Sequence, residues 1–192
     1  MIHSSKFSVV LDACVLYPAP VRDILLSLAA EGLFKPKWTH EIQNEWVKNL
    51  LKNRTDLSEL SLAYAINAMN NAFPDANVTH YESLIPALIL PDLNDRHVLA
   101  CAIRSKADLI ITFNLKDFPK HQLKLFDLDV QDPDELISNL IELNEINSYM
   151  AFLKMVDRLK NPTKSVNQVL ENLRNLGLKA SVNKLEKFDF HF

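Results

Sequence analysis

The sequence predicts an α/β fold, a three-layer sandwich in which helices flank a parallel sheet, followed by a helical C-terminal extension. Short apolar segments at 8–11 and 109–111 are too short for helices and are typical of buried parallel strands. Strands alternate with helical patterns up to residue 143, as in parallel sheets. Beyond this point the pattern is helical only. We therefore expect an α/β domain at residues 1–145 and the extension at 146–192.

Composition excludes several classes of protein. The 192 residues are 48% hydrophobic and 23% charged, and no apolar run reaches the roughly 18 to 20 residues that span a bilayer. The first ten residues lack the apolar core of a secretory signal, so we expect a cytoplasmic protein that does not associate with membranes. Gly32 and Gly177 are the only glycines, which excludes GxGxxG and P-loop nucleotide sites. Cys14 and Cys101 are expected to be reduced residues of the core.

Charge is unevenly distributed along the chain. Residues 1–149 carry 20 acidic and 13 basic side chains, whereas residues 150–192 carry 4 and 8. An acidic main domain argues against broad adhesion to nucleic acid, but it suits a group of carboxylates that binds divalent cations. Basic side chains of the tail, such as Lys154 and Arg158, are either phosphate contacts or part of a solvated helix face.

The first half of the chain is expected to hold two strands and three helices. In order these are a strand at 8–11, a helix at 21–33, an extended segment at 34–38, helices at 40–52 and 57–73, and a short strand at 78–80. Gly32 ends the first helix, and Pro36 favours the extended segment. Thr39 is a suitable N-cap for the second helix, on which Glu41 and Glu45 lie one turn apart on the same face.

The second half continues the alternation. We expect a helix that starts near Asp95, strands at 109–111 and 125–130, and helices at 133–143, 148–159 and 166–176. The apolar spacing of Val98, Leu99 and Ala102 gives the first of these helices one buried face. Pro133 is a typical first residue of a helix.

Several acidic residues lie at the ends of these elements. Asp12 ends the first strand, Asp95 lies on the first turn of a helix, and Asp117 follows the strand at 109–111. Each has an ordinary explanation as a turn or helix cap, and Asp92 with Asp95 fits a capping box. We expect Asp92 to cap the helix and Asp95 to face a site. Glu45 lies beside the apolar side of its helix.

These acids are expected to converge, because the carboxyl ends of parallel strands meet at one edge of the sheet, where ligands bind. Converging carboxylates raise one another's pKa values unless a cation neutralises them. Oxygen ligands without cysteine or paired histidines favour Mg²⁺ or Mn²⁺ over zinc. The sequence thus predicts a magnesium or manganese site.

Four motifs carry a resemblance to a known family. The segments VVLDACVLY, THEIQNEW, DLNDRHVLACAI and ADLIITFNLKDFP, in this order, resemble the PIN-domain nucleases and, within them, the VapC-like toxins of bacterial toxin–antitoxin pairs. The resemblance covers roughly residues 7–143, and residues 159–188 resemble a helical extension found in one subgroup. It implies a PIN-like fold, a metal-dependent endoribonuclease activity on RNA, a cognate antitoxin and, as is common among relatives, a homodimer.

The resemblance also implies roles for individual residues. The first three acids of the family fall on Asp12, Glu45 and Asp95, which would be catalytic metal ligands. Many relatives have a fourth acid where this chain has Asn114, so the nearby Asp117 is our candidate for the missing charge. Thr112, Asn114, Asp92 and Glu41 are expected to surround the ligands, with Thr112 orienting water or ligand. Cys14 stands where Asn is common.

Two other functions are compatible with parts of the pattern. A degenerate domain of the same fold would bind RNA or a protein partner without cutting, and Asn114 in place of an acid favours it. A phosphoryl-transfer enzyme of the haloacid-dehalogenase type would need a second Asp two residues after Asp12, where the chain has Cys14. Four of the histidines, His40, His80, His97 and His121, are expected to be structural or exposed to solvent.

Overall fold

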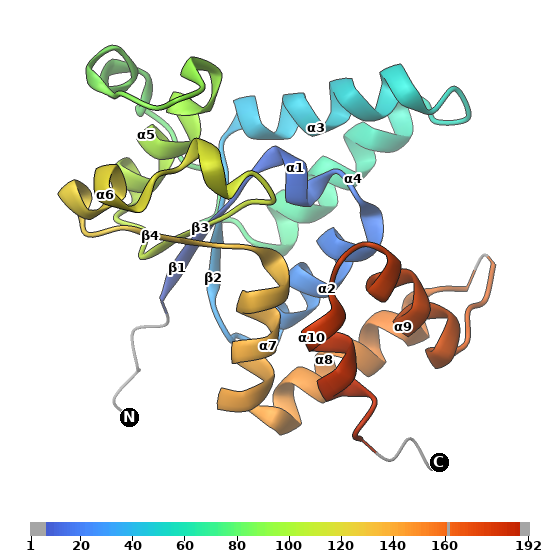
Figure 1. Cartoon of the computed structure of the whole chain (residues 1–192). Coiled ribbons are helices and arrows are strands. Elements are labelled where there is room, and N and C mark those ends of the chain that lie inside the picture. The colour runs from blue at the N-terminus through green and yellow to red at the C-terminus, as the bar shows by residue number, and fades with distance from the viewer. Residues whose placement is uncertain (1–6, 161, 189–192) are drawn as a thin grey trace. The chain divides into compact units, whose positions relative to one another are not determined.

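The sheet has four strands, all parallel, in the order β2-β1-β3-β4 (Figure 1). A computed structural model describes residues 7–160 and 162–188. The strands are β1 (Ser8–Leu11), β2 (Lys35–Lys37), β3 (Leu109–Ile111) and β4 (Asp129–Gln131). The predicted α/β class is therefore confirmed, and β1 and β3 have the predicted bounds.

The two central strands fix the edge at which the site forms. β1 and β3 pair in register from Val9 opposite Leu109 to Leu11 opposite Ile111, so both end at the same level. The backbone N–H of Asp12 continues the ladder by donating to the carbonyl of Ile111 at 3.1 Å. The apolar side chains of both strands are buried, as expected for central strands of a parallel sheet.

Helix α5 (Arg96–Ser105) packs against β1, β2 and β3. Its buried side chains include the predicted stripe of Val98, Leu99 and Ala102, which confirms the buried face. The helix ends at Lys106, which has a left-handed conformation with φ of 50°.

Five further helical segments near the sheet arise from local signals. They are α1 (Ala13–Leu16), α3 (His40–Asn53), α4 (Glu59–Ala72), α6 (Lys120–Leu123) and a 3₁₀ segment at Glu82–Ala87. The Thr39 hydroxyl accepts from the Ile42 N–H at 3.1 Å, so the predicted N-cap of α3 is confirmed. Ser58 and Ser61 form a capping box at the start of α4. The sequence did not predict α1, for which Asp12 is the N-cap residue.

Two predicted strands differ in the structure. The strand expected at 125–130 lies at Asp129–Gln131, because Lys124–Phe126 forms a 3₁₀ turn and Asp127 takes a left-handed φ of 55°. The short strand expected at 78–80 is reduced to one bridge between Trp38 and Asn77, and His80 has a φ of 60° that breaks an extended chain. Both errors arise at residues other than glycine, Asp127 and His80, whose backbone has a left-handed conformation. Residue type alone does not predict that conformation at such positions.

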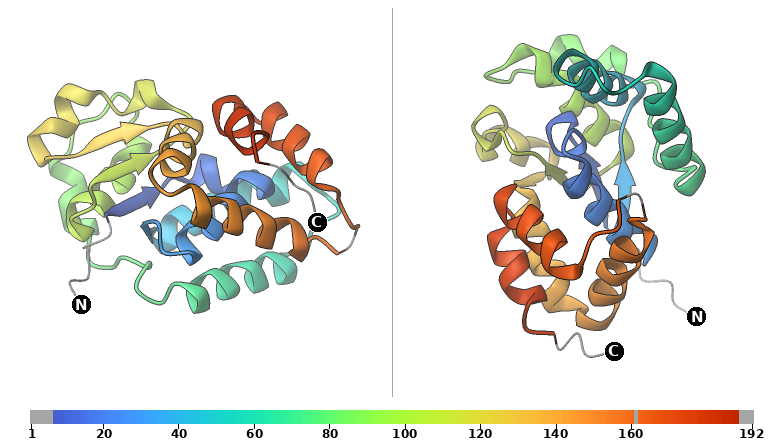
Figure 2. Two further views of the ribbon diagram at one scale, coloured as in Figure 1. Left: turned by 90° about the horizontal axis from the view of Figure 1, so that it is seen from below. Right: turned by 90° about the vertical axis from the view of Figure 1, so that its right-hand side faces the viewer.

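The remaining helices form a second compact unit (Figures 1 and 2). They are α2 (Ala19–Ala30), α7 (Pro133–Leu143), α8 (Glu145–Arg158), α9 (Val166–Asn175) and α10 (Lys179–Leu185). Helix α2 packs against α7, α8 and α9, and α10 packs against α7 and α9. The Asp134 carboxylate accepts the N–H groups of Ala180 and Ser181 at 2.8 Å each, which holds the start of α10.

The compact units combine segments that are distant in sequence. One holds residues 7–17 and 34–131, and the other holds 18–33 together with the C-terminal helices from residue 132. The domain boundary expected near residue 145 stays a prediction, because units defined by packing need not fold independently. Every helix in the described part of the chain is too short or too polar to cross a bilayer.

Candidate active site

A cavity of about 550 Å³ opens at the carboxyl edge of the sheet. Asp12 enters it directly after β1, Asn114 follows β3, Glu45 comes from α3 and Asp95 from the start of α5. The complete lining is Asp12, Ala13, Cys14, Tyr17, Glu45, Lys48, Asn49, Asn53, Asp95 and Asn114. The structure thus brings together three predicted acids that are far apart in sequence.

Asp12 is the most tightly held of the acids. Asp12 is only 5% exposed. Its Oδ2 accepts a hydrogen bond from the Thr112 hydroxyl at 2.7 Å and another from the Cys14 thiol at 3.0 Å. The Thr112 Oγ1 also accepts from the backbone N–H of Asn114 at 3.0 Å. These bonds fix the Asp12 carboxylate between the ends of β1 and β3. They also offset the cost of burying a charged group, which needs hydrogen-bond partners.

Cys14 has a polar role that the sequence did not predict. We expected a compact core residue, but Cys14 lines the cavity and its Sγ also accepts the Phe113 N–H at 3.2 Å. Burial, and next the negative charge of Asp12, raise the pKa of the Cys14 thiol to about 12. The thiol therefore stays protonated at neutral pH and is a stable hydrogen-bond donor to Asp12.

Asp95 shows most clearly that the acids lie close together. It is the N-cap residue of α5 and is half-buried. Burial and then the charges of Asp12, Asp92 and Asp117 raise the pKa of Asp95 to about 7. A cation that enters the cavity would stabilise the ionised form of this carboxyl group.

Glu45 and Glu41 flank a buried histidine. The His97 Nε2 lies 3.2 Å from the Glu45 Oε1, and its Nδ1 lies 3.8 Å from the Glu41 Oε2. Burial lowers the pKa of His97, but the adjacent Glu45 carboxylate and the charges of Glu41 and Asp12 raise it more, so the net shift is upward. The Tyr81 hydroxyl donates to the Glu41 Oε2 at 3.1 Å, and Glu41 is not among the described residues that line the cavity.

His97 is a neighbour of the site to which sequence reasoning gave no functional role, and the cavity residues Tyr17, Lys48, Asn49 and Asn53 were not predicted either. It is 3% exposed, so it is structural rather than exposed to solvent. The available signal was weak: His97 lies two residues after Asp95, but both glutamates remain more than a third exposed and do not require a positive partner.

The other predicted positions divide into two groups. Thr112 and Asn114 adjoin Asp12 as described. Asp92 accepts the Asn94 N–H at 2.9 Å and caps the 3₁₀ segment Leu93–Asp95, not helix α5 as expected, because Asp95 is the N-cap residue of α5. Asp117, on the 3₁₀ segment Leu115–Asp117, is not among the described residues that line the cavity. Its charge nevertheless acts on Asp95.

The donor set fits a hard divalent cation. Within residues 7–160 and 162–188, no three His, Cys, Asp or Glu side chains are close enough together to form a complete metal site. Asp12 and Asp95 nonetheless share one cavity, and their repulsion contributes to the raised pKa of Asp95. Carboxylate oxygens are the ligands that Mg²⁺ and Mn²⁺ prefer. Glu45 lines the same cavity, where its Oε1 lies 3.2 Å from the His97 Nε2.

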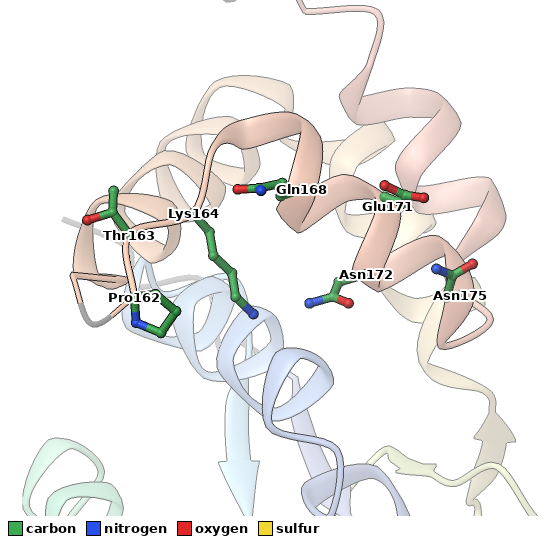
Figure 3. A pocket seen from close by; sticks show the side chains of 7 residues that line it. All are labelled: Pro162, Thr163, Lys164, Gln168, Glu171, Asn172 and Asn175. Atoms are coloured by element: carbon green, nitrogen blue, oxygen red, sulfur yellow. The ribbon is translucent and has the colours of Figure 1, made fainter.

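A second hollow, of about 360 Å³, lies along α9 in the helical unit (Figure 3). Its lining residues are Pro162, Thr163, Lys164, Gln168, Glu171, Asn172 and Asn175. It has one acidic side chain, so it lacks the converging carboxylates of the cavity at the sheet edge. The predicted site residues Asp12, Glu45, Asp95 and Asn114 thus line the first cavity and not this hollow.

Fold and site together define a class of protein, an α/β domain with acids gathered at the carboxyl edge of a parallel sheet. A family model described as "PIN domain" matches residues 8–116, which is more than half of the chain. The chain therefore belongs to the PIN-domain family. A second family model, described as "VapC50 C-terminal domain", matches residues 133–187.

One curated relative is similar over part of its length. The protein described as "Putative ribonuclease VapC50" from Mycobacterium tuberculosis (strain ATCC 25618 / H37Rv) is 34% identical over 103 residues. This alignment covers 54% of the present chain and 60% of the relative. No solved structure matches the chain. The predicted VapC-like PIN resemblance is thus confirmed.

Proposed function

We propose that this chain is a divalent-metal-dependent endoribonuclease that acts as the toxin of a toxin–antitoxin pair. The observation that carries the proposal is the cavity shared by Asp12 and Asp95, in which burial and then neighbouring carboxylates raise the pKa of Asp95 to about 7. Membership of the PIN-domain family and the similarity to a protein described as a ribonuclease support a nuclease.

In this proposal Asp12 and Asp95 hold the metal ion, with either Glu45 or Asp117 as a third acid. A bound Mg²⁺ or Mn²⁺ would lower the pKa of a water molecule and neutralise charge on the scissile phosphate. Thr112 and Cys14 hold the Asp12 carboxylate in one orientation through their hydrogen bonds.

The remaining cavity residues would position the substrate. Asn114 presents an uncharged amide, which can donate a hydrogen bond to a phosphate oxygen, whereas an acid there would repel it. Attack of water on phosphorus, with departure of the 3′ oxygen, gives a 5′-phosphate and a 3′-hydroxyl.

A cleavage assay on structured RNAs tests the proposal. The wild-type chain is expected to cut with Mn²⁺ and to be inactive with EDTA, and Asp95→Asn and Asp12→Asn are expected to abolish cutting while the fold is kept. Asp75→Asn is the matched control, because Asp75 is an exposed acid outside the cavity. Cleavage by Asp95→Asn at the wild-type rate would contradict the assigned roles.

A catalytically degenerate domain is the second candidate. Asn114 favours it, since this position lines the cavity and carries no charge. Such a domain would bind RNA or a protein partner without cutting. Metal titration separates the two candidates, because an ion that binds only the folded state raises its thermal stability, and a degenerate domain would show no such shift.

The toxin assignment also predicts protein partners. A cognate antitoxin encoded next to this chain is expected to bind near the acids, where a basic side chain such as arginine would replace the metal ion. Co-expression with the product of the adjacent gene, followed by cleavage assays on the purified complex, tests this expectation. We also propose a homodimer, which sedimentation measurements would detect.

A further inference from the structure

The cavity continues beyond the acids along helix α3. Glu45, Asn49 and Asn53 follow one another at intervals of four residues and all line the cavity, as does Lys48. A helix rises about 1.5 Å per residue, so the two amides lie about 6 Å and 12 Å further along the helix than Glu45. The acids therefore occupy one end of an elongated polar surface.

The far end of this surface carries an aromatic ring. Tyr17, which follows α1, is half-buried and lines the same cavity. The amide of Asn53 donates a hydrogen bond to the Tyr17 hydroxyl at 3.2 Å, which links the ring to α3. An aromatic ring held beside amide groups provides a stacking surface next to hydrogen-bonding groups, the combination used to bind unpaired bases.

Lys48 supplies the positive charge of the surface. Among the described residues no hydrogen bond or ion pair engages the Lys48 side chain, and the same is true of the Asn49 side chain. Arg54, by contrast, is held by both carboxylate oxygens of Asp56 at 2.8 and 2.6 Å. Lys48 is thus the cation that lines the cavity and is free to contact a phosphate.

We propose that Tyr17, Lys48, Asn49 and Asn53 form the site that binds the unpaired nucleotides next to the scissile phosphate. This inference rests on the proposed function, because it assigns the substrate of that same cavity. Tyr17 stacks on a base, Lys48 contacts a phosphate, and the two amides hydrogen-bond base edges or a 2′-hydroxyl. These four residues then determine which RNA is cut.

RNA binding tests the inference separately from cleavage. Asp95→Asn serves as the parent protein so that labelled single-stranded oligoribonucleotides stay intact, and fluorescence anisotropy gives their affinity. Replacing Tyr17 by leucine is expected to weaken binding at least about fivefold, and Tyr17→Phe is expected to bind like the parent, because the ring is kept. Lys48→Gln is expected to reduce the slope of log affinity against log salt concentration by about 1, because one phosphate contact is lost.

Matched controls come from exposed residues outside the cavity. Tyr64→Leu, Lys52→Gln and Asn67→Ala are expected to leave binding unchanged. A 2-aminopurine base in the oligonucleotide reports stacking directly, and its fluorescence is expected to be quenched by the parent but not by the protein with Tyr17→Leu. In the wild-type background, Asn49→Ala and Asn53→Ala are expected to change the preferred cleavage sites.

The outcomes distinguish the two proposals. If Tyr17→Leu and Lys48→Gln bind RNA like the parent, or if the parent binds no RNA, this inference is overturned whatever the cleavage assay gives. If the variants lose binding but the wild-type chain never cuts, the inference stands and the nuclease proposal fails. Loss of binding to an antitoxin, with RNA binding intact, would overturn the assignment to RNA.

Discussion

At the scale of single residues, the site depends on the hydrogen bonds that hold Asp12. The Thr112 hydroxyl donates to Asp12 and accepts from the Asn114 N–H, and it is fully buried. Thr112→Val keeps the shape but leaves buried polar atoms without a partner, which costs about 1 to 3 kcal/mol of unfolding free energy. Urea denaturation measures this loss. Thr112→Ser keeps the hydroxyl and is the control, and equal stability of the two variants would contradict the prediction.

The second residue-scale prediction concerns Asp95. Its pKa is about 7 in the folded chain against an ordinary value of 3.8, so the folded state binds a proton more readily than the unfolded state between these values. The free energy of unfolding therefore falls as the pH rises from about 3.8 towards 7, because the folded chain must lose a proton that it binds more tightly than the unfolded chain does. In EDTA, Asp95→Asn is expected to melt about 2 to 4 °C above wild type at pH 8.

Differential scanning fluorimetry from pH 4 to pH 8 tests that prediction. The advantage of Asp95→Asn is expected to shrink as the pH falls towards 4, where the wild-type carboxyl group is protonated in the folded chain. An advantage that does not change with pH would show that packing, rather than charge repulsion, distinguishes the variant.

At the scale of elements, sequence patterns predicted the pieces with strong local signals. The bounds of β1, β3 and α7 follow from apolar runs and from Pro133, and the start of α3 follows from Thr39. The place of Asp12 at the site was predictable because parallel strands end at one edge, whereas the places of Glu45 and Asp95, which lie on helical segments, were supported mainly by the family resemblance. The positions of β4 and α10 were not, since left-handed residues and tertiary contacts such as those of Asp134 decide them.

The C-terminus of α5 gives a prediction at the element scale. Lys106 is exposed and has a φ of 50°, a conformation that is strained for residues with a Cβ atom. Lys106→Gly is expected to raise the free energy of unfolding by about 0.5 to 1 kcal/mol, since glycine adopts this cap without strain. Lys106→Ala, the control for loss of charge, is expected to give no gain in chemical denaturation, and an equal gain would contradict the explanation.

At the scale of the whole molecule, part of the acidic charge of residues 1–149 lies where it opposes folding. After burial, the charges of Asp12, Asp92 and Asp117 each raise the pKa of Asp95 near the carboxyl edge of the sheet. The folded chain therefore carries a repulsion that the unfolded chain, with its acids far apart, does not. A cation that binds only the folded arrangement removes this repulsion, so metal binding and global stability must be linked.

This linkage gives a prediction for the intact chain. At 100 times its dissociation constant, Mn²⁺ is expected to stabilise the wild-type fold by about 2.7 kcal/mol. For a chain of this size that corresponds to a rise of about 5 to 11 °C in the melting temperature. Asp12→Asn and Asp95→Asn are expected to lose most of this rise, while Asp75→Asn keeps it. Equal rises in all four proteins would mean that Mn²⁺ binds elsewhere, and the acids at the sheet edge would then have no role in holding a metal ion.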